Sequence, residues 1–293
     1  MKVWKKILSA ALVTALVLVL GACGGSSSSG ASSGSSDSSD EDTSSSSSGS
    51  GASEDYFEWE DNIIVGLTEE GAQQTSLVIP ARCEGFTEYA FIDAAETLLS
   101  VTFESDDVIT SLSEAFVYLT ALESITLPAS LTDMSGAEFL SCSSLKEIVI
   151  PDGVANVGKY CFNGCESLTS VVFEGGTEVI GDYAFWLCDS LSEVVFCDSI
   201  SEIGENAFYQ CESITSLTLP AGLKTVGEYA FYGLSSLEEI YVPEEMETES
   251  VDGTAFYQSF EVPVYVVEGS WIDENFDEVF YSDKNGVYDK CYL

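Results

Sequence analysis

The amino-acid sequence predicts a strand-rich α/β solenoid, in which a curved parallel β-sheet carries one short helical turn per repeat. The first observation is a phenylalanine that recurs with gaps of 25, 23, 23, 23, 23, 23 and 25 residues. The second is a short segment of alternating apolar residues that follows each phenylalanine. A fixed period of this length is typical of stacked units that bury their cores against their neighbours. The recurring residues are Phe91, Phe116, Phe139, Phe162, Phe185, Phe208, Phe231 and Phe256.

Each repeat is predicted to contain one short strand. Val171-Val172-Phe173 and Leu217-Thr218-Leu219 alternate between two faces and are rich in β-branched residues, which favours strands. One strand per turn must form a parallel sheet, and a proline directly after the strand ends the ladder without losing a hydrogen bond. Five of the six prolines stand at this place: Pro80, Pro128, Pro151, Pro220 and Pro243.

The segment before the strand is predicted to be a short helical turn, Asp182 to Leu187 in one copy. A glycine lies four residues before the repeat phenylalanine, where a tight entry or a positive φ is expected. Phe185 is expected to point inward and to stack on the phenylalanines of the neighbouring turns. The phenylalanines are therefore interpreted as a core column rather than as an aromatic binding strip.

The motif Leu-x-x-Val-x-Phe/Leu, with its Ala-Phe dyad and 23-residue period, resembles the BspA-like leucine-rich-repeat class of bacterial surface proteins. The resemblance covers roughly Trp59 to Tyr281. It implies a leucine-rich-repeat solenoid displayed on the cell surface, in a class associated with adhesion and binding. The alanine of the dyad is replaced at Glu138 and Cys161, and the longer gaps at both ends are typical of terminal repeats that cap a stack.

Residues 1–22 are predicted to be a lipoprotein signal peptide. Lys2, Lys5 and Lys6 form a positive segment, and the apolar run that follows is too short to span a bilayer comfortably. Its end, Leu20-Gly21-Ala22-Cys23, resembles the lipobox of bacterial lipoproteins, which implies that Cys23 is lipidated. An ordinary secretory signal with a coincidental cysteine is the alternative.

The remaining chain divides into four predicted parts. Residues 23–54 are rich in Ser and Gly and have no apolar surface to offset the entropy of ordering, so a disordered tether is expected. Residues 55–75 form an N-terminal cap around Tyr56, Phe57 and Trp59. Residues 76–267 form the leucine-rich-repeat solenoid with nine strands. Their predicted centres are Val78, Val101, Ile125, Ile148, Val171, Val194, Leu217, Ile240 and Val264.

Residues 268–293 are predicted to form a C-terminal cap and tail. Ser270 is the expected N-cap of a short helix, whose apolar face shields the last turn from solvent. The structure of the tail from Ser282 to Leu293 is left open.

The composition bounds the partners. The chain has 50 Asp and Glu against 9 Lys and Arg, with a formal net charge of −41. A surface this acidic repels phosphate backbones, so no nucleic-acid partner is expected, whereas basic partners or cations are favoured. No Asp-x-Asp-x-Asp-Gly loop is present. We therefore predict no metal site and no cofactor.

Four of the nine cysteines are predicted to form a buried column. Each stands three residues after the repeat phenylalanine, where other turns carry Leu119 and Leu234. Parallel Cβ vectors in such a column give poor disulfide geometry, so free thiols that behave as small apolar side chains are expected. The column consists of Cys142, Cys165, Cys188 and Cys211.

No enzymatic activity and no catalytic residue are predicted. The chain contains no histidine, which excludes Ser/His/Asp and Cys/His arrangements. No motif singles out two carboxylates of the glycosidase kind, so a carbohydrate-active enzyme is the least favoured function.

We therefore expect a monomeric, lipid-anchored protein on the extracellular face of the bacterial cell membrane. Its repeat surface would bind an extracellular protein or a glycan, in the manner of an adhesin. The alternative is a structural cell-envelope protein that organises other surface proteins.

The expected binding surface is the outward face of the parallel sheet, toward its C-terminal end. One residue per strand, between two core positions, points outward. Tyr241 and Tyr265 would offer aromatic area with hydroxyl groups for sugar stacking or protein contact, unless the helix from Trp271 folds back and covers them. The candidate binding residues are Thr102, Thr126, Thr218, Tyr241 and Tyr265.

Overall fold

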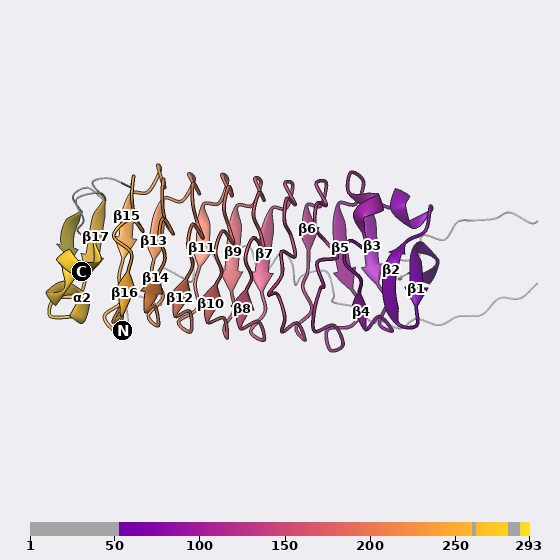
Figure 1. Ribbon diagram of the computed structural model, residues 1–293, viewed down its shortest axis with the longest axis horizontal. Helices are drawn as coiled ribbons and strands as arrows, with labels where there is room; N and C mark the ends of the chain where they lie inside the picture. The colour runs from indigo at the N-terminus through magenta and orange to yellow at the C-terminus, as the bar shows by residue number, and fades with distance from the viewer. Residues whose placement is uncertain (1–52, 260–261, 281–287) are drawn as a thin grey trace, which may run out of the picture. The chain divides into compact units, whose positions relative to one another are not determined.

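The computed structural model describes residues 53–259, 262–280 and 288–293, which lie in one compact unit. Within it, turns of chain follow one another from the N-terminal to the C-terminal end (Figure 1). The predicted signal peptide, most of the predicted tether and Cys23 lie outside the described residues.

One row of parallel strands confirms all nine predicted strand positions. The row consists of three successive sheets, with strand orders β3-β5-β6, β11-β9-β7 and β13-β15-β17-β18, in which β18 (Asp289–Tyr292) is an additional strand after the nine predicted ones. Figure 1 shows them following one another along the stack. The nine strands are β3 (Ser76–Ile79), β5 (Ser100–Phe103), β6 (Ser124–Ile125), β7 (Glu147–Ile150), β9 (Ser170–Phe173), β11 (Glu193–Val195), β13 (Ser216–Thr218), β15 (Glu239–Tyr241) and β17 (Pro263–Val266).

A second row of strands, which the sequence did not predict, runs beside the first. Each of its members has two residues, and five of them form one parallel sheet of order β16-β14-β12-β10-β8. Ile180 is in register with Val157 on one side and with Ile203 on the other, so each strand contributes one inward residue to the core. The sheet contains β8 (Asn156–Val157), β10 (Val179–Ile180), β12 (Glu202–Ile203), β14 (Thr225–Val226) and β16 (Ser250–Val251).

The predicted helical turn is replaced by consecutive turns in the described repeats, with a 3-10 helix, η3 (Ile92–Ala94), in an early one. In the copy around Phe185, Tyr183 and Leu187 have φ of 58° and 59°. The N–H groups of Tyr183, Phe185 and Leu187 donate to carbonyl groups of the next turn, at 2.9, 2.8 and 3.3 Å. A helical turn would direct these N–H groups along its own segment, whereas left-handed residues point alternate N–H groups toward the neighbour. We call this third set of inter-turn hydrogen bonds the turn ladder.

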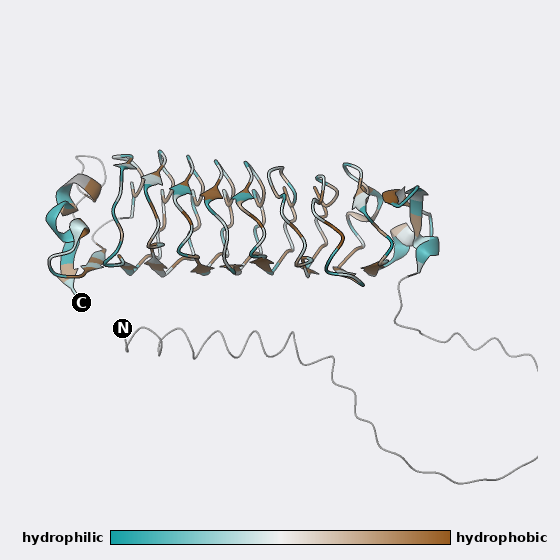
Figure 2. Cartoon of the chain, turned by 90° about the horizontal axis from the view of Figure 1, so that it is seen from below, coloured by the Kyte–Doolittle hydropathy of each residue, from teal (hydrophilic) through white to brown (hydrophobic). Residues whose placement is uncertain are grey.

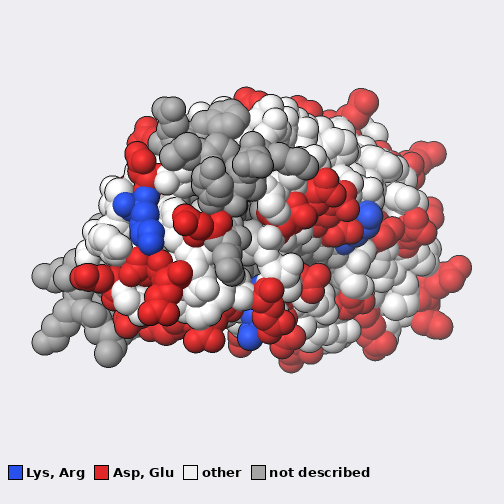
Figure 3. Space-filling model, turned by 60° about the vertical axis from the view of Figure 1, so that its left-hand side comes forward, with Lys and Arg blue, Asp and Glu red and all other residues white. Residues whose placement is uncertain are grey.

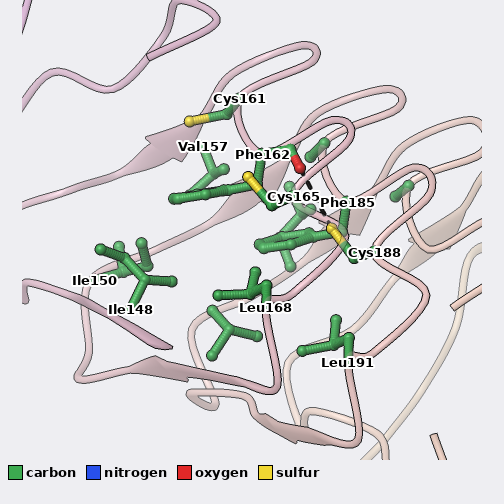
Figure 4. Packing of buried hydrophobic residues seen from close by; sticks show 14 of the residues in the cluster. Ile148, Ile150, Val157, Cys161, Phe162, Cys165, Leu168, Phe185, Cys188 and Leu191 are labelled. Carbon is green, nitrogen blue, oxygen red and sulfur yellow. Dashed lines mark hydrogen bonds between the residues drawn. The ribbon is translucent and has the colours of Figure 1, made fainter. Parts of the chain in front are cut away.

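The phenylalanine column forms the centre of the core, as predicted. All eight repeat phenylalanines are fully buried. Consecutive rings are stacked, with centroids 4.8 to 5.9 Å apart and interplanar angles of 5 to 20°. Figure 4 shows Phe162 and Phe185 beside each other, with Leu168, Leu191 and the β7 residues Ile148 and Ile150 on one side of them. At 90° to the first view, hydrophobic segments recur at the same level of successive turns (Figure 2).

The glycine four residues before Phe162, Phe185, Phe208 and Phe231 is required by close packing of backbones. A Cβ on Gly204 would lie 2.7 Å from the backbone nitrogen of Asp182, in the preceding turn. A Cβ on Gly227 would lie 2.6 Å from the backbone nitrogen of Glu205. Neither glycine has a positive φ. Of the two predicted reasons for this glycine, the structure supports the tight approach.

The cysteine column is buried, as predicted, and its thiols have a further role. Each thiol donates a hydrogen bond of 3.1 to 3.3 Å to the carbonyl oxygen of the phenylalanine one turn earlier. Burial raises the pKa of Cys142 to about 12 and that of Cys188 well above its ordinary value. The eight described cysteines are free thiols. The column therefore packs as small apolar side chains that also satisfy backbone carbonyl groups.

An antiparallel hairpin closes the N-terminal end of the stack. It is formed by β1 (Phe57–Glu60) and β2 (Ile63–Leu67), preceded by η1 (Glu54–Tyr56) and followed by η2 (Gly71–Gln73). β2 continues as a parallel neighbour of β4 (Gly85–Phe86). Phe57 is buried, and its ring meets that of Phe91 edge-on at 6.5 Å. The aromatic cluster therefore covers the first member of the phenylalanine column.

Two short helices, α2 (Trp271–Glu274) and α3 (Phe276–Val279), close the C-terminal end. Ser270 caps α2 as predicted, because its hydroxyl oxygen accepts a hydrogen bond from the Asp273 N–H at 3.2 Å. The ring centroid of Phe280 lies 5.4 Å from that of Phe256, so Phe280 extends the phenylalanine column. The tail left open by the sequence adds β18 (Asp289–Tyr292), which pairs in parallel with β17.

Candidate binding surface

The outward face of the main strands carries the five candidate residues from the sequence. Strand register places Val78 beside Thr102, and Thr218 beside Tyr241 and then Tyr265. Thr102, Thr126 and Thr218 are exposed, whereas Tyr241 and Tyr265 are half-buried. The register thus brings Thr218, Tyr241 and Tyr265 together, while Thr102 and Thr126 lie several turns away.

Tyr241 and Tyr265 stack on each other. Their ring centroids are 5.0 Å apart with an interplanar angle of 14°. The Tyr241 hydroxyl donates to Glu239 Oε2 at 2.9 Å, and this hydrogen bond is the largest cause of the raised pKa of Tyr241. The capping helices pack Phe280 on Phe256 instead, so both tyrosines keep part of their surface exposed. One ring face of each tyrosine is used by the other.

A larger aromatic surface lies on the turn segments, and the sequence reasoning missed it. Six rings form an unbroken series of contacts across four turns, with centroid distances from 4.5 to 6.3 Å, and Tyr257 continues it from Tyr232 at 5.7 Å. Tyr209 and Tyr232 stack face to face at 4.5 Å, and Trp186 meets Tyr183 and Tyr209 edge-on. We call the set of six the aromatic strip: Tyr160, Tyr183, Trp186, Tyr209, Tyr229 and Tyr232.

The repeat itself places the strip on the surface. Its members stand two residues before or one residue after the repeat phenylalanine. Phe185 is buried, whereas Tyr183 and Trp186 on either side of it are half-buried, and Tyr160 is 36% exposed. Aromatic residues at these two positions, repeated from residue 160 onward, were the signal in the sequence that could have revealed the strip.

Carboxylates line the strip. Asp182, Glu205 and Glu228 occupy one position in consecutive turns, three residues before the phenylalanine. The Tyr183 hydroxyl donates to Glu205 Oε1 at 2.8 Å, and this hydrogen bond is the first cause of a raised pKa of Tyr183. Burial, followed by the charge of Glu228, raises the pKa of Tyr229. The strip therefore combines aromatic rings with negative charge.

The same column contains one cation, Lys159, in the turn before Asp182. Its Nζ lies 5.2 Å from the centroids of both Tyr160 and Tyr183, and 3.5 Å from Asp182 Oδ2. Arg82 makes similar contacts at the N-terminal cap. Its Cζ lies 3.5 Å from the Trp59 ring centroid, and its Nε lies 3.1 Å from Glu54 Oε2. Aromatic rings next to a carboxylate are favourable environments for such cations.

Basic side chains are scarce on this surface. Figure 3 shows acidic side chains over much of one face and Lys or Arg at only a few places. Each described Lys or Arg forms an ion pair with an acid of its own chain. Within the described ranges, neither Glu205 nor Glu228 is paired with a Lys or Arg.

The described residues offer little to metal or substrate chemistry. No group of three His, Cys, Asp or Glu side chains among them is placed to hold a metal ion. A shallow, open hollow lies near the N-terminal cap, lined by Leu67, Thr68, Ala72, Gln73 and Asp93 among others. In the part of the chain that the structure covers, no helix is long and apolar enough to span a bilayer.

The two departures from the Ala-Phe dyad lie next to each other in space. Glu138 is 2% exposed, and its Oε2 accepts a hydrogen bond from the Glu114 N–H at 2.8 Å. Burial raises the pKa of Glu138 to about 7. Burial and then the charge of Glu138 raise the pKa of Cys161 well above its ordinary value. One turn of the core therefore contains a titratable carboxyl group where most other turns have alanine.

Comparison with known families accounts for this architecture. Six copies of the BspA type leucine rich repeat region match residues 70–179 and 155–271. The chain belongs to the BspA type leucine-rich-repeat family. The family assignment and the fold that the sequence predicted are thus confirmed.

Several solved structures are similar to the chain at low identity. The pneumococcal vaccine antigen PcpA is 21% identical, with a TM-score of 0.38, over 75% of this chain and 69% of its own. A leucine-rich repeat protein from Eubacterium ventriosum is 20% identical, with a TM-score of 0.46, over 63% of this chain and 58% of its own. The T. pallidum leucine rich repeat protein is 17% identical, with a TM-score of 0.39, over 82% of this chain and 99% of its own. No curated protein matches the chain.

In this BspA type solenoid, the repeat determines the inward residues and leaves the outward positions free to vary. Phe185 and Cys188 point into the stack, while Tyr183 and Trp186 lie on its surface. The turns of this chain therefore differ from one another mainly in such outward positions.

Proposed function

We propose that the protein is a lipid-anchored extracellular binding protein that engages a macromolecular partner through its repeat surface. The observation that carries the proposal is the amount of aromatic surface that the solenoid leaves partly exposed. The aromatic strip spans four turns, and the Tyr241–Tyr265 pair lies on the main strands. Tyr and Trp in such positions supply large, rigid contact area for partners.

The proposed anchor is Cys23, and the proposed location is the extracellular face of the bacterial cell membrane. The lipobox-like Leu20-Gly21-Ala22-Cys23 and the positive, then apolar, segment before it support this placement. A Ser- and Gly-rich stretch between Cys23 and the first described residues would separate the solenoid from the membrane.

Non-covalent binding is the proposed activity, and the partner would be an extracellular protein or a glycan. The described turns present an open surface rather than an enclosed pocket. The sheet-face residues Thr102, Thr126, Thr218, Tyr241 and Tyr265 remain a proposed contact surface, alongside the aromatic strip.

The test is to screen the full chain, kept in detergent micelles, against arrays of purified extracellular proteins and of glycans. Each partner found is then titrated against Tyr241→Ala with Tyr265→Ala, and against Tyr209→Leu with Tyr232→Leu. The proposal expects at least one partner whose affinity falls for one of these folded pairs. Partners that bind both pairs as tightly as the unchanged chain, or a glycan that is hydrolysed, would contradict it.

A further inference from the structure

We infer that the aromatic strip binds a basic, extended segment of a partner protein, with Lys or Arg side chains seated between tyrosine rings and the carboxylates of Glu205 and Glu228, beyond the Asp182 that Lys159 occupies. The inference rests on the proposed function, because it names the face and the chemistry of the partner.

Lys159 shows how the strip receives a cation. Its ammonium group lies beside both Tyr160 and Tyr183, 5.2 Å from each ring centroid, and pairs with Asp182 of the next turn at 3.5 Å. The chain itself therefore supplies one occupant of this surface. The side chains of Lys159 and Asp182 both stay about half exposed, with 52% and 43% of their surface accessible.

The next two turns carry Glu205 and Glu228 at the position of Asp182. Glu205 accepts hydrogen bonds from the hydroxyl of Tyr183 and the side-chain amide of Asn206, at 2.8 and 3.0 Å. Glu228 stands one turn further, beside Tyr229, whose ring meets Tyr232 edge-on at 5.5 Å. Within the described residues, no Lys or Arg reaches either glutamate.

In the part of the chain that the structure describes, no Lys or Arg is left to pair with Glu205 or Glu228. The described Lys and Arg are already paired with acids of their own, and the formal net charge of the chain is −41. A basic segment would be steered to this surface by the overall field and then held by the rings. Charge alone would attract such a segment to any face, whereas along the strip rings and carboxylates recur in consecutive turns, unlike at the single pair Tyr89–Tyr118 beside Glu88.

The carboxylates of the strip favour cations over neutral sugars. Tyr209 and Tyr232 lie 4.5 Å apart at 3°, so each covers one face of the other. A sugar and a cation would both use a ring face, but a cation gains in addition the charge of a neighbouring carboxylate, as Lys159 does with Asp182. The acidic residues at this position recur once per turn, so three of them span about 10 Å, given roughly 4.8 Å between parallel strands. Two or three basic residues of an extended segment cover that length.

The probe is an oligoarginine peptide, titrated by calorimetry into the full chain in detergent micelles at physiological ionic strength. The decisive variant is Tyr209→Leu with Tyr232→Leu, which keeps the net charge and most of the apolar volume. Its affinity should fall about tenfold, the loss expected for two cation–π contacts. The matched control is Tyr89→Leu with Tyr118→Leu, because that stacked pair, with centroids 6.4 Å apart, lies outside the strip. Its affinity should stay unchanged.

A second pair of variants tests the carboxylates without touching the rings. Glu205→Gln with Glu228→Gln should weaken the peptide more than Glu244→Gln with Glu245→Gln, which removes the same charge from exposed residues elsewhere. Glu205→Gln keeps a side-chain oxygen that can accept the hydrogen bond from the Tyr183 hydroxyl. The glutamine variant should therefore fold even if Tyr209→Leu with Tyr232→Leu does not. Trp186 fluorescence, identified by comparison with Trp186→Phe, should change on binding.

Equal affinities for both tyrosine pairs and for both glutamate pairs would overturn the inference, because binding would then depend on overall charge only. A partner lost from Tyr241→Ala with Tyr265→Ala, but not from the strip variants, would also overturn it while leaving the proposed function intact. Tight binding of a neutral glycan to the strip in place of the peptide would count against it as well.

Discussion

The thiol of Cys188 donates a hydrogen bond to the carbonyl oxygen of Phe162, 3.3 Å away in the preceding turn (Figure 4). Cys142, Cys165 and Cys211 repeat this relationship along the stack. Two turns after the last cysteine, beyond Leu234, a hydroxyl makes the same contact, since Ser259 donates to the carbonyl of Phe231 at 3.2 Å. The cysteine column is therefore part of the backbone hydrogen bonding as well as of the core.

The four cysteines of the column should resist alkylation in the native protein. Burial raises the pKa of Cys142, Cys165, Cys188 and Cys211, and the thiolate is the reactive form. Cys197 and Cys291 are half-buried and serve as internal controls that should be labelled first. Mass spectrometry of alkylated peptides, without reductant, makes the measurement. Native labelling of the column at the rate of Cys197, or bridges within it, would contradict the prediction.

Replacing Phe185 by alanine should destabilise the protein by about 3–5 kcal/mol, the usual range for a buried phenylalanine. Its ring is fully buried and stacks on Phe162 and Phe208, at 5.1 and 5.0 Å. Because turns contact only their neighbours, hydrogen exchange should accelerate first around residues 162–208. Chemical denaturation provides the free energy, with the exposed Tyr160→Ala as control. A denaturation midpoint equal to that of the unchanged chain would refute the assignment.

Glu138 should make the stability depend on pH. Its pKa is raised from 4.5 to about 7, so the folded state holds the proton more tightly than the unfolded chain. Stability from this group is therefore fully present below pH 4.5 and is lost as pH rises to about 7. The loss amounts to about 3 kcal/mol. Asp133, Glu114 and Cys161 are its titratable neighbours.

Glu138→Gln should remove this pH dependence, because the amide oxygen can still accept from the Glu114 N–H but does not titrate. The measurement is the difference in unfolding free energy between the variant and the unchanged chain at several pH values. That difference should grow in favour of the variant as pH rises toward neutrality. Parallel curves for the two proteins would exclude Glu138 as the titrating group.

Cys23→Ser should leave the protein without lipid. If the lipobox resemblance holds, metabolic labelling with a fatty-acid analogue should mark the unchanged chain and the control Cys291→Ser, but not Cys23→Ser. The variant should be found unprocessed or shed rather than in the membrane fraction. Labelling of Cys23→Ser at the level of the control would refute the proposed anchor.

The parts of the fold that recur with a fixed period could be predicted from the sequence. Each turn contributes one main strand and one phenylalanine, and four turns contribute a cysteine. Because these residues recur at a fixed spacing, the sequence shows which of them point into the core. The second row of strands was missed because two residues, such as Val179 and Ile180, show no alternation. The left-handed residues Tyr183 and Leu187 carry no glycine signal, so the turn ladder was mistaken for a helical turn. β18 lies after the period is lost.

The surface was harder to predict than the core. Thr218, Tyr241 and Tyr265 could be placed together because strand register follows from the repeat, yet the stacking of the two rings could not be read from one chain position. The aromatic strip was missed because the repeat pattern predicts the burial of Phe185 but does not predict contacts between outward residues such as Tyr183 and Trp186. Which partner these rings take depends on ring orientation and unpaired charge, and both require coordinates.

The turn ladder has a mechanical consequence. Together with the two rows of strands, it directs inter-turn hydrogen bonds along the axis of the stack, so that pulling the two ends apart loads them one turn at a time rather than all at once. A surface protein held at one end and bound to a partner along its side would therefore yield to flow by peeling single turns. Each 23-residue turn would release about 75 Å of extended chain. Single-molecule stretching should record a series of such equal steps, and rupture in one event would show that the turns yield together.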